Sequence, residues 1–232
     1  MAKRYPLHPT NPQPRTIASL CDSLRQGAVV LYPTDTVYAI GCDLNSKSAV
    51  ERVRHIKRLA NEKPLTFICL SLSDAAQYCK IEDPAYRLMR RLIPGPYTFV
   101  LPATKLVPRV VMDPKRKTTG IRIPRNPICQ AILENLGNPV ISTSAHLPEP
   151  GDFALETDLP PAEPTGEAEL FDRLDGLVDG IVTVDDRESL ILGGEADYQV
   201  STILDLTGHD PIVVRRGLGW AAVEQTGMIH SK

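Results

Sequence analysis

The chain has 232 residues, of which 42% are apolar and 23% are charged, and its formal net charge at pH 7 is −2. These values are typical of one large globular domain and exclude collagen, coiled coils and wholesale disorder. No stretch approaches the roughly 18 uninterrupted apolar residues of a membrane span. Five scattered cysteines without a Cys-x-x-Cys pair, and a basic N-terminus with no apolar segment behind it, predict a cytoplasmic protein without a secretory signal.

Apolar periodicity and turn signals predict alternating helices and strands along the whole chain. In the first half we expect a helix over 14–26, a strand over 28–32, an extended segment over 37–42, a helix capped by Ser46, a strand over 65–70, and short helices opening at Ser73 and at Asp83. In the second half we expect strands over 97–101 and 119–123, a helix from Asn126 to Gly137, a strand over 139–143, a helix over 167–174, and strands over 177–184, 201–206 and 212–215.

Two segments lack such patterns. Residues 147–165 are rich in Pro, Glu and Gly and are expected to form a long mobile loop. The last 15 or so residues are expected to form a weakly structured tail. The simplest organisation is a single α/β domain over residues 10–220, built on one sheet, with a C-terminal tail over 221–232.

Charges of opposite sign are separated along the chain. Residues 87–125 hold ten basic side chains and one acid, Asp113, whereas residues 152–197 hold fourteen acids and two arginines. This separation favours a local positive potential and a phosphate-bearing partner. The alternative is that the two segments neutralise each other across the fold.

The first of three polar clusters is the segment 32–38, which follows a predicted buried strand. In open α/β sheets, ligands bind beyond the strand ends. Thr34, Asp35 and Thr36 offer hydroxyl and carboxylate groups to the amine and hydroxyl of a small polar ligand. The alternative is a local turn in which Asp35 accepts hydrogen bonds from backbone amides.

The second cluster is cationic and lies at the end of the second predicted helix. Lys57, Arg58 and Lys63 either cap that helix through its dipole or clamp a phosphate. Arg122 and Arg125, at the end of another predicted strand, are candidates to converge on the same anion.

The third cluster, residues 142–146 (Ser-Thr-Ser-Ala-His), also leaves a buried strand and suits phosphate or carboxylate binding. A serine hydrolase is disfavoured, because His146 does not readily reach Ser144 on adjacent extended backbone and no Gly-x-Ser-x-Gly turn is present. The other histidines are isolated, so no metal site is predicted. The sequence also lacks a Walker A loop and a dinucleotide-binding fingerprint.

Several ordered motifs make the chain resemble the YrdC/YciO-like family over about residues 10–220. They are Tyr-Pro-Thr-Asp-Thr-Val-Tyr-Ala-Ile-Gly at 32–41, Ile-Lys-Arg at 56–58, Lys-Pro-Leu at 63–65, Pro-Gly-Pro-Tyr-Thr-Phe-Val-Leu at 94–101, Thr-Gly-Ile-Arg-Ile-Pro at 119–124, Ser-Thr-Ser-Ala at 142–145, Ser-Thr-Ile-Leu-Asp-Leu-Thr at 201–207 and Val-Val-Arg-Arg-Gly at 213–217. The resemblance implies a single twisted open α/β sheet flanked by helices, with a positively charged concave face that also binds double-stranded RNA.

The resemblance also implies an activity. Synthases of this family join threonine, bicarbonate and ATP, with Mg2+ expected alongside the nucleotide, into threonylcarbamoyl-AMP and pyrophosphate. The product supplies the N6-threonylcarbamoyladenosine of certain tRNAs. Carried over by position, the implied catalytic residues are Lys57 and Ser144. The implied substrate- and nucleotide-binding residues are Thr34, Thr36, Arg58, Thr118, Arg122, Ser142, His146, Ser201 and Arg215.

Three positions depart from the synthase pattern and are closer to the YciO branch. The family arginine two residues after the lysine is Leu59, the asparagine of its Ser-Ala-Asn motif is His146, and the histidine after its Pro-Leu pair is Ile68. One alternative is therefore a double-stranded RNA- or nucleotide-binding module with little or no synthase activity. Another is an α/β domain that binds a different nucleotide or acyl-adenylate.

Overall fold

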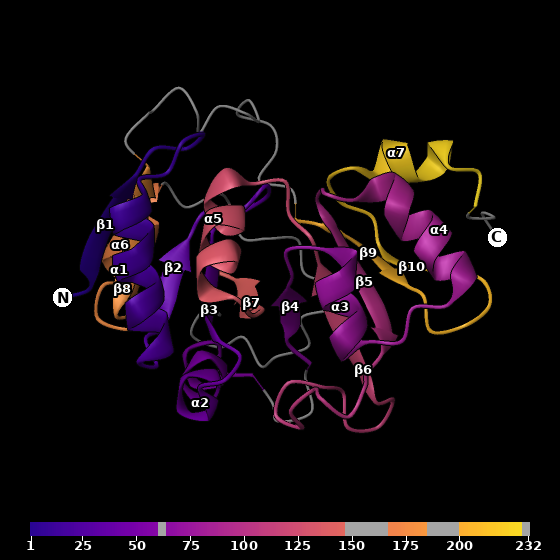
Figure 1. Cartoon of the computed structure of the whole chain (residues 1–232), viewed down its shortest axis with the longest axis horizontal. Helices are drawn as coiled ribbons and strands as arrows, with labels where there is room; N and C mark the ends of the chain where they lie inside the picture. The colour runs from indigo at the N-terminus through magenta and orange to yellow at the C-terminus, as the bar shows by residue number, and fades with distance from the viewer. Residues whose placement is uncertain (60–63, 147–166, 185–199, 229–232) are drawn as a thin grey trace.

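The protein is built on one mixed ten-stranded sheet that extends along its long axis (Figure 1). The computed structural model describes residues 1–59, 64–146, 167–184 and 200–228. The strands are β1 (Lys3–Leu7), β2 (Val30–Tyr32), β3 (Ala39–Asp43), β4 (Thr66–Ile68), β5 (Tyr97–Pro102), β6 (Thr118–Arg122), β7 (Val140–Ser144), β8 (Gly180–Val184), β9 (Thr202–Asp205) and β10 (Ile212–Arg215). The helices are α1 (Pro14–Arg25), α2 (Lys47–Ile56), α3 (Leu72–Tyr78), α4 (Asp83–Leu92), α5 (Pro127–Leu136), α6 (Glu167–Leu174) and α7 (Trp220–Gln225).

The strand order is β1-β8-β2-β3-β7-β4-β6-β5-β9-β10, so neighbours in the sheet are often distant in the sequence. The pairs β1/β8, β2/β8, β4/β6 and β5/β9 are parallel, and the other five pairs are antiparallel. The two edge strands, β1 and β10, lie toward opposite ends of the molecule in Figure 1.

Capping residues set the ends of several helices as the sequence predicts. The Ser46 hydroxyl accepts a hydrogen bond from the Ala49 N–H at 3.4 Å, at the start of α2. Asn126 accepts one from the Cys129 N–H at 3.0 Å, at the start of α5. The latter helix ends at Gly137, whose φ of 78° lies in the left-handed region that glycine adopts without strain.

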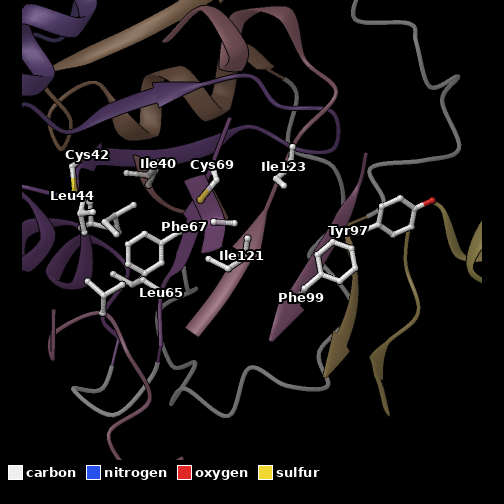
Figure 2. Close-up of a cluster of buried hydrophobic side chains, with 14 of the residues drawn as sticks. Ile40, Cys42, Leu44, Leu65, Phe67, Cys69, Tyr97, Phe99, Ile121 and Ile123 are labelled. Atoms are coloured by element: carbon white, nitrogen blue, oxygen red, sulfur yellow. The ribbon is translucent and has the colours of Figure 1, made fainter. Parts of the chain in front are cut away.

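The main hydrophobic core covers one face of the sheet. Figure 2 shows side chains from β3, β4, β5 and β6 that belong to it, including Phe67, Phe99 and Ile121. Helices α2, α3 and α4 contribute Val53, Ala75 and Leu88 to the same cluster. Each large side chain buried here stabilises the fold by about 1.5–3 kcal/mol, so this core holds the sheet together across strands distant in the sequence.

A second hydrophobic core lies on the opposite face, and α1 and α5 are the described helices that cover it. Leu20 of α1 and Ile132 of α5 pack there with Tyr32, Ala39 and other residues of β1, β8, β2, β3, β7 and β4. The two helices touch each other, since Arg25 donates to the Asn135 carbonyl at 2.5 Å. These two helices cover the half of this face that is formed by β1, β8, β2, β3 and β7. The half formed by β6, β5, β9 and β10 contributes no residue to this core within the described part of the chain.

The structure departs from the sequence-based expectations in three places. Strand β1 was not predicted, although it pairs with β8 along its whole length. Helix α3 begins after Ser71 rather than at Ser73, because the Ser71 hydroxyl accepts the Asp74 N–H at 3.1 Å. The expectation of a weakly structured tail is wrong at α7, since Val223 is fully buried in the main core. The expected loop over 147–165 and Lys63 lie outside the described residues.

Candidate functional site

One face of the sheet carries most of the predicted site residues. Side chains alternate between faces along a strand, and residues paired across strands share a face. Phe67, Ile121 and Phe99 pair with one another and point into the main core. The neighbouring positions therefore point to the opposite side and form a row in register: Ser142, Thr66, Gly120, Val100 and Asp205. We call the side of β7, β4, β6, β5 and β9 that carries this row the polar face.

The polar face continues beyond the helices that cover the second core. That core includes no residue of β5, β6, β9 or β10 within the described part of the chain. On the edge strand, Ile212 pairs with Asp205 and is 62% exposed. Gly120 keeps the centre of the face flat, because a Cβ there would lie 2.9 Å from the Thr66 hydroxyl.

Arg122 organises the first group of site residues. It extends from the end of β6 on the polar face, and its Nη2 donates to the Thr36 hydroxyl at 2.9 Å, to the Thr34 hydroxyl at 3.5 Å, and to the Asp35 carboxylate. The Thr34 hydroxyl in turn donates to the Val37 carbonyl at 2.8 Å. The segment after β2 therefore folds back over the sheet, and the structure brings Thr34, Thr36 and Arg122 together. The sequence instead offers Arg122 as a partner of the cationic cluster at the end of the second predicted helix.

Asp35 is the buried counter-charge of Arg122. The two side chains are only 10% and 11% exposed. The other carboxylate oxygen of Asp35 accepts the Arg125 N–H at 2.8 Å, so both oxygens are used. Arg122 Nε, by contrast, is buried and has no hydrogen-bond partner among the described residues. Such an unsatisfied buried donor is costly unless a ligand or water completes it.

Arg215 and Ser201 form the second group, on the neighbouring strands. The Arg215 guanidinium donates to the Ser201 carbonyl at 3.0 and 3.1 Å and to its hydroxyl at 3.3 Å. The Ser201 hydroxyl also lies 2.9 Å from the Thr98 hydroxyl on β5. Burial lowers the pKa of Arg215, and the nearby positive charge of Arg122 lowers it further. Arg122 therefore lies close enough to Arg215 for the two positive charges to interact.

Ser142 lies between these groups and the covered half of the face. Its hydroxyl accepts a hydrogen bond from the Tyr32 hydroxyl at 2.7 Å. The Tyr32 ring fits there because residue 41 is glycine, where a Cβ would lie 2.8 Å from the ring. Burial raises the pKa of Tyr32 above its ordinary value, so its hydroxyl remains a proton donor at neutral pH.

Lys57 and His146 meet at the C-terminal end of β7, a central strand of the sheet. Lys57 caps the C-terminus of α2, is 3% exposed, and donates from Nζ to the His146 carbonyl, just beyond β7. Ser144, two residues before His146, pairs with Ala39 and so lies on the polar face. Arg54 of α2 also donates to the Val110 carbonyl at 3.1 Å, which ties this helix end to the segment before β6.

The remaining two predicted residues are placed differently. Thr118 begins β6 and shares the polar face with Gly120 and Arg122, at the end of the strand away from Arg122. Arg58 is exposed and adopts a left-handed φ of 49° after α2. Among the described residues, no side-chain hydrogen bond or ion pair joins Arg58 to the other site residues, and Leu59 packs against the main core.

The predicted basic segment 87–125 does not form one surface. Arg87, Arg90 and Arg91 lie on the exposed side of α4, whose buried side packs on the main core. Arg122 is buried on the polar face instead. An exposed group remains between β5 and β6, consisting of Lys105, Arg109, Lys115, Arg116 and Lys117.

Sequence reasoning missed three polar residues beside the site, Thr98, Arg116 and Asp205. Thr98 lies in one of the motifs that carry the family resemblance, and it contacts Ser201. For Asp35 the sequence left a ligand-binding role and a local turn open, and in the structure its side chain pairs with Arg122. Arg116 donates to Asp205 at 2.6 Å at the far end of the row. Only their alternation along β5 and β9 signals which face Thr98 and Asp205 occupy.

Other features of the described residues lie away from this site or concern the chain as a whole. A surface cavity of about 330 Å³ lies near β1 and β8, and Lys3, Arg52 and Asp179 contribute to its lining. No three His, Cys, Asp or Glu side chains within the described residues gather to hold a metal ion. None of the described helices is long and apolar enough to cross a membrane.

A family model, a related sequence and a solved structure all indicate the same protein family. The model of the Sua5_yciO_yrdC family (telomere recombination) matches residues 22–217. The YciO protein of Escherichia coli (strain K12) is 41% identical over 219 residues, covering 94% of this chain and 97% of its own. A crystal structure of E. coli YciO has a TM-score of 0.79 and covers 94% of this chain and 97% of its own, at 39% identity.

Two further relatives carry functional names. The threonylcarbamoyl-AMP synthase of Vibrio vulnificus (strain YJ016) is 34% identical over 128 residues, covering 54% of this chain and 68% of its own. The crystal structure of P. abyssi Sua5 complexed with L-threonine has a TM-score of 0.79 at 25% identity, covering 99% of this chain and 62% of its own. The expected architecture of one open sheet flanked by helices is confirmed, and the chain belongs to the Sua5/YciO/YrdC family.

Proposed function

We propose that this protein is a threonylcarbamoyl-AMP synthase-like enzyme. It would join threonine, bicarbonate and ATP to give threonylcarbamoyl-AMP, pyrophosphate and water, for N6-threonylcarbamoyladenosine in tRNA. The observation that carries the proposal is the cluster of Arg122 with Thr34 and Thr36, next to Arg215. A likeness to P. abyssi Sua5, whose crystal structure contains L-threonine, supports the same substrate.

Amino-acid binding is the role we assign to the arginine groups. Guanidinium groups bind carboxylates through paired N–H donors, and Arg122 has a buried Nε with no partner among the described residues. Two arginines against the single buried carboxylate of Asp35 leave a positive charge for the carboxylate of threonine. The hydroxyls of Thr34 beside Arg122, of Ser201 beside Arg215 and of Ser142 on the same face suit the polar groups of the amino acid.

Nucleotide binding is the role we assign to the C-terminal end of β7. The threonine amine would condense with bicarbonate to a carbamate with loss of water, and a carbamate oxygen would attack the α-phosphorus of ATP as the bond to pyrophosphate breaks. Lys57 and Ser144 would face the developing charge on the α-phosphate, where fixed donors lower the barrier. Magnesium, brought by the phosphates of ATP, would neutralise the leaving pyrophosphate.

The test measures pyrophosphate release by purified protein, together with mass-spectrometric detection of threonylcarbamoyl-AMP. We expect product only when ATP, threonine and bicarbonate are all present. Lys57→Ala should lower the rate by at least 100-fold, because it removes a cation from the reacting phosphate. Lys47→Ala, a surface change on the same helix, should keep the wild-type rate. Wild-type activity equal to that of Lys57→Ala would refute the proposal.

A second candidate function is binding to double-stranded RNA. The exposed basic residues between β5 and β6 support it, because phosphate contacts dominate such affinity. Binding should weaken steeply with salt and show little sequence preference, since A-form RNA is recognised by shape and 2′-hydroxyls. Absent or salt-insensitive binding of a duplex RNA would exclude this candidate.

A further inference from the structure

A rigid basic turn joins the loop after β5 to β6. Asp113 closes it: one carboxylate oxygen accepts the N–H groups of Lys115 and Arg116 at 2.8 and 2.9 Å. Asp113 N–H also donates to the Thr118 carbonyl, and the Lys117 N–H donates to the Asp113 carbonyl, both at 2.8 Å. The turn therefore holds the Arg116 backbone in one place before any ligand binds.

The side chain of Arg116 is held on the polar face. Its Nη2 donates to Asp205 Oδ2 at 2.6 Å and to the Thr207 hydroxyl at 3.3 Å. Asp205 is itself fixed, because its other oxygen accepts the Thr207 N–H at 2.9 Å and the Thr207 hydroxyl at 2.6 Å. Burial alone would raise the pKa of Asp205, but the hydrogen bonds from Thr207 and Arg116 outweigh it and lower the pKa, so the carboxylate stays charged.

Only one nitrogen of the Arg116 guanidinium, Nη2, makes these hydrogen bonds to the described residues. All of the arginine's side-chain hydrogen bonds to the described residues come from Nη2, and the side chain is 53% exposed. A guanidinium has five N–H donors in a planar fork. Arg116 is therefore an oriented arginine with donors to spare, which is the arrangement that phosphate recognition needs.

The register of the sheet places Arg116 opposite the other two arginines. Asp205 ends the row that runs through Val100 and Gly120. Arg122 lies on β6, two strands away from Asp205 and two residues beyond Gly120. With about 4.8 Å between strands and about 3.3 Å between residues along a strand, the backbones of Asp205 and Arg122 are roughly 12 Å apart. Uncharged side chains, those of Thr98, Val100 and Ile203 beside Gly120, form the floor between them, so an elongated ligand with a negative group at each end matches the face.

We infer that Arg116 binds the terminal phosphate of ATP on the polar face, and that Asp205 is the residue that positions it. This inference rests on the proposed function and adds a phosphate-binding residue outside the predicted site. A nucleotide is favoured over a nucleic-acid backbone because Arg116 is turned onto the face of the sheet by Asp205, whereas Lys117 of the same turn has no such contact within the described residues.

The test is calorimetric titration of the full chain with ATP and with AMP. Arg116→Ala should weaken ATP binding at least tenfold and AMP binding less than twofold, because AMP lacks the contacted phosphate. Arg116→Lys, which keeps the charge but loses the fork, should fall between Arg116→Ala and wild type. Lys117→Gln, which removes a charge from the same turn, should change ATP binding less than threefold.

The positioning role of Asp205 has its own readout. Asp205→Asn should weaken ATP binding in the wild-type background but not in the Arg116→Ala background, since coupled residues are not additive. A merely structural Asp205 would give the same loss in both backgrounds, which would overturn its assignment. Thermal unfolding of each variant checks that it is folded.

The outcomes separate this inference from the proposed function. If wild type binds ATP and Arg116→Ala binds it equally well, the inference fails while the proposed function stands. Equal losses in Arg116→Ala and Lys117→Gln would indicate a diffuse charge effect, of the kind an RNA-binding surface gives, and would also overturn it. If wild type binds neither nucleotide, the proposed function fails and the inference fails with it.

Discussion

Asp35 and Arg122 form a buried ion pair although 87 positions separate them in the sequence. The pair fixes the segment after β2 against the end of β6, and it brings Thr34 and Thr36 to the same guanidinium. The geometry of the candidate amino-acid site therefore depends on one long-range electrostatic contact. Its loss should be visible in stability as well as in ligand binding.

Replacing Asp35 by alanine should destabilise the fold by about 3–5 kcal/mol, because it leaves the Arg122 charge buried without its partner. Urea unfolding of the purified variant measures this. The double variant Asp35→Leu/Arg122→Met should recover more than half of the loss, since it removes both charges. A loss below about 1 kcal/mol for Asp35→Ala would show that water already compensates Arg122.

Thr119 offers a stabilising substitution in the main core. Its side chain is fully buried, and its hydroxyl has no hydrogen-bond partner among the described residues. Thr119→Val keeps the shape and removes the unsatisfied hydroxyl, so unfolding free energy should rise by about 1 kcal/mol. Thr119→Ser, which keeps the hydroxyl and loses a methyl group, should lower it by about 1 kcal/mol. The opposite order of the two variants in thermal unfolding would contradict this account.

Gly41 should not tolerate a side chain. A Cβ there would lie 2.8 Å from the Ile141 carbonyl oxygen, the Tyr32 ring and Val140. Gly41→Ala should cost about 1–3 kcal/mol through overpacking and should displace Tyr32 from Ser142. Gly176→Ala is the matched control, because no atom lies within 4 Å of a Cβ at that position. Similar unfolding midpoints for the two variants would disprove the close approach at Gly41.

The five cysteines should be inert in the native protein. All are buried, and burial raises the pKa of Cys21 from its ordinary 9.0 to about 11 and that of Cys42 and Cys79 to about 12. Since the thiolate is the reactive form, a thiol reagent at pH 8 should label the native chain slowly and all five cysteines once it is unfolded. Rapid labelling of the native chain would contradict this burial.

The same raised pKa values predict a loss of stability at high pH. A thiol whose pKa is higher in the folded state stabilises the fold fully below the unfolded value and loses this contribution as pH rises through the folded value. For Cys21 that window is pH 9.0 to about 11. Cys21→Ala should therefore show a smaller fall in melting temperature between pH 9 and 11 than wild type. Parallel pH profiles for the two proteins would contradict the assignment.

Local signals in the sequence determined most of the elements of this fold. Ser46 and Asn126 cap α2 and α5 where expected, and Gly137 ends α5, because capping and left-handed backbone depend on a few adjacent residues. The missed strand β1 carries only a weak pattern of its own and exists through its pairing with β8. Helix α7 was missed for a similar reason, since burial of Val223 in a distant core stabilises it.

The sequence by itself also named Thr34, Arg122, Ser201 and Arg215 as site residues. Only the tertiary structure decided how they meet: the order β6-β5-β9-β10 places Arg122 near Arg215, and the same order brings Arg116 to Asp205, 89 positions away. The strand order depends on the main core as a whole, because strands distant in the sequence bury their apolar side chains together there. No local pattern carries that information, so partners such as Asp35 and Asp205 emerge only when the sheet is assembled.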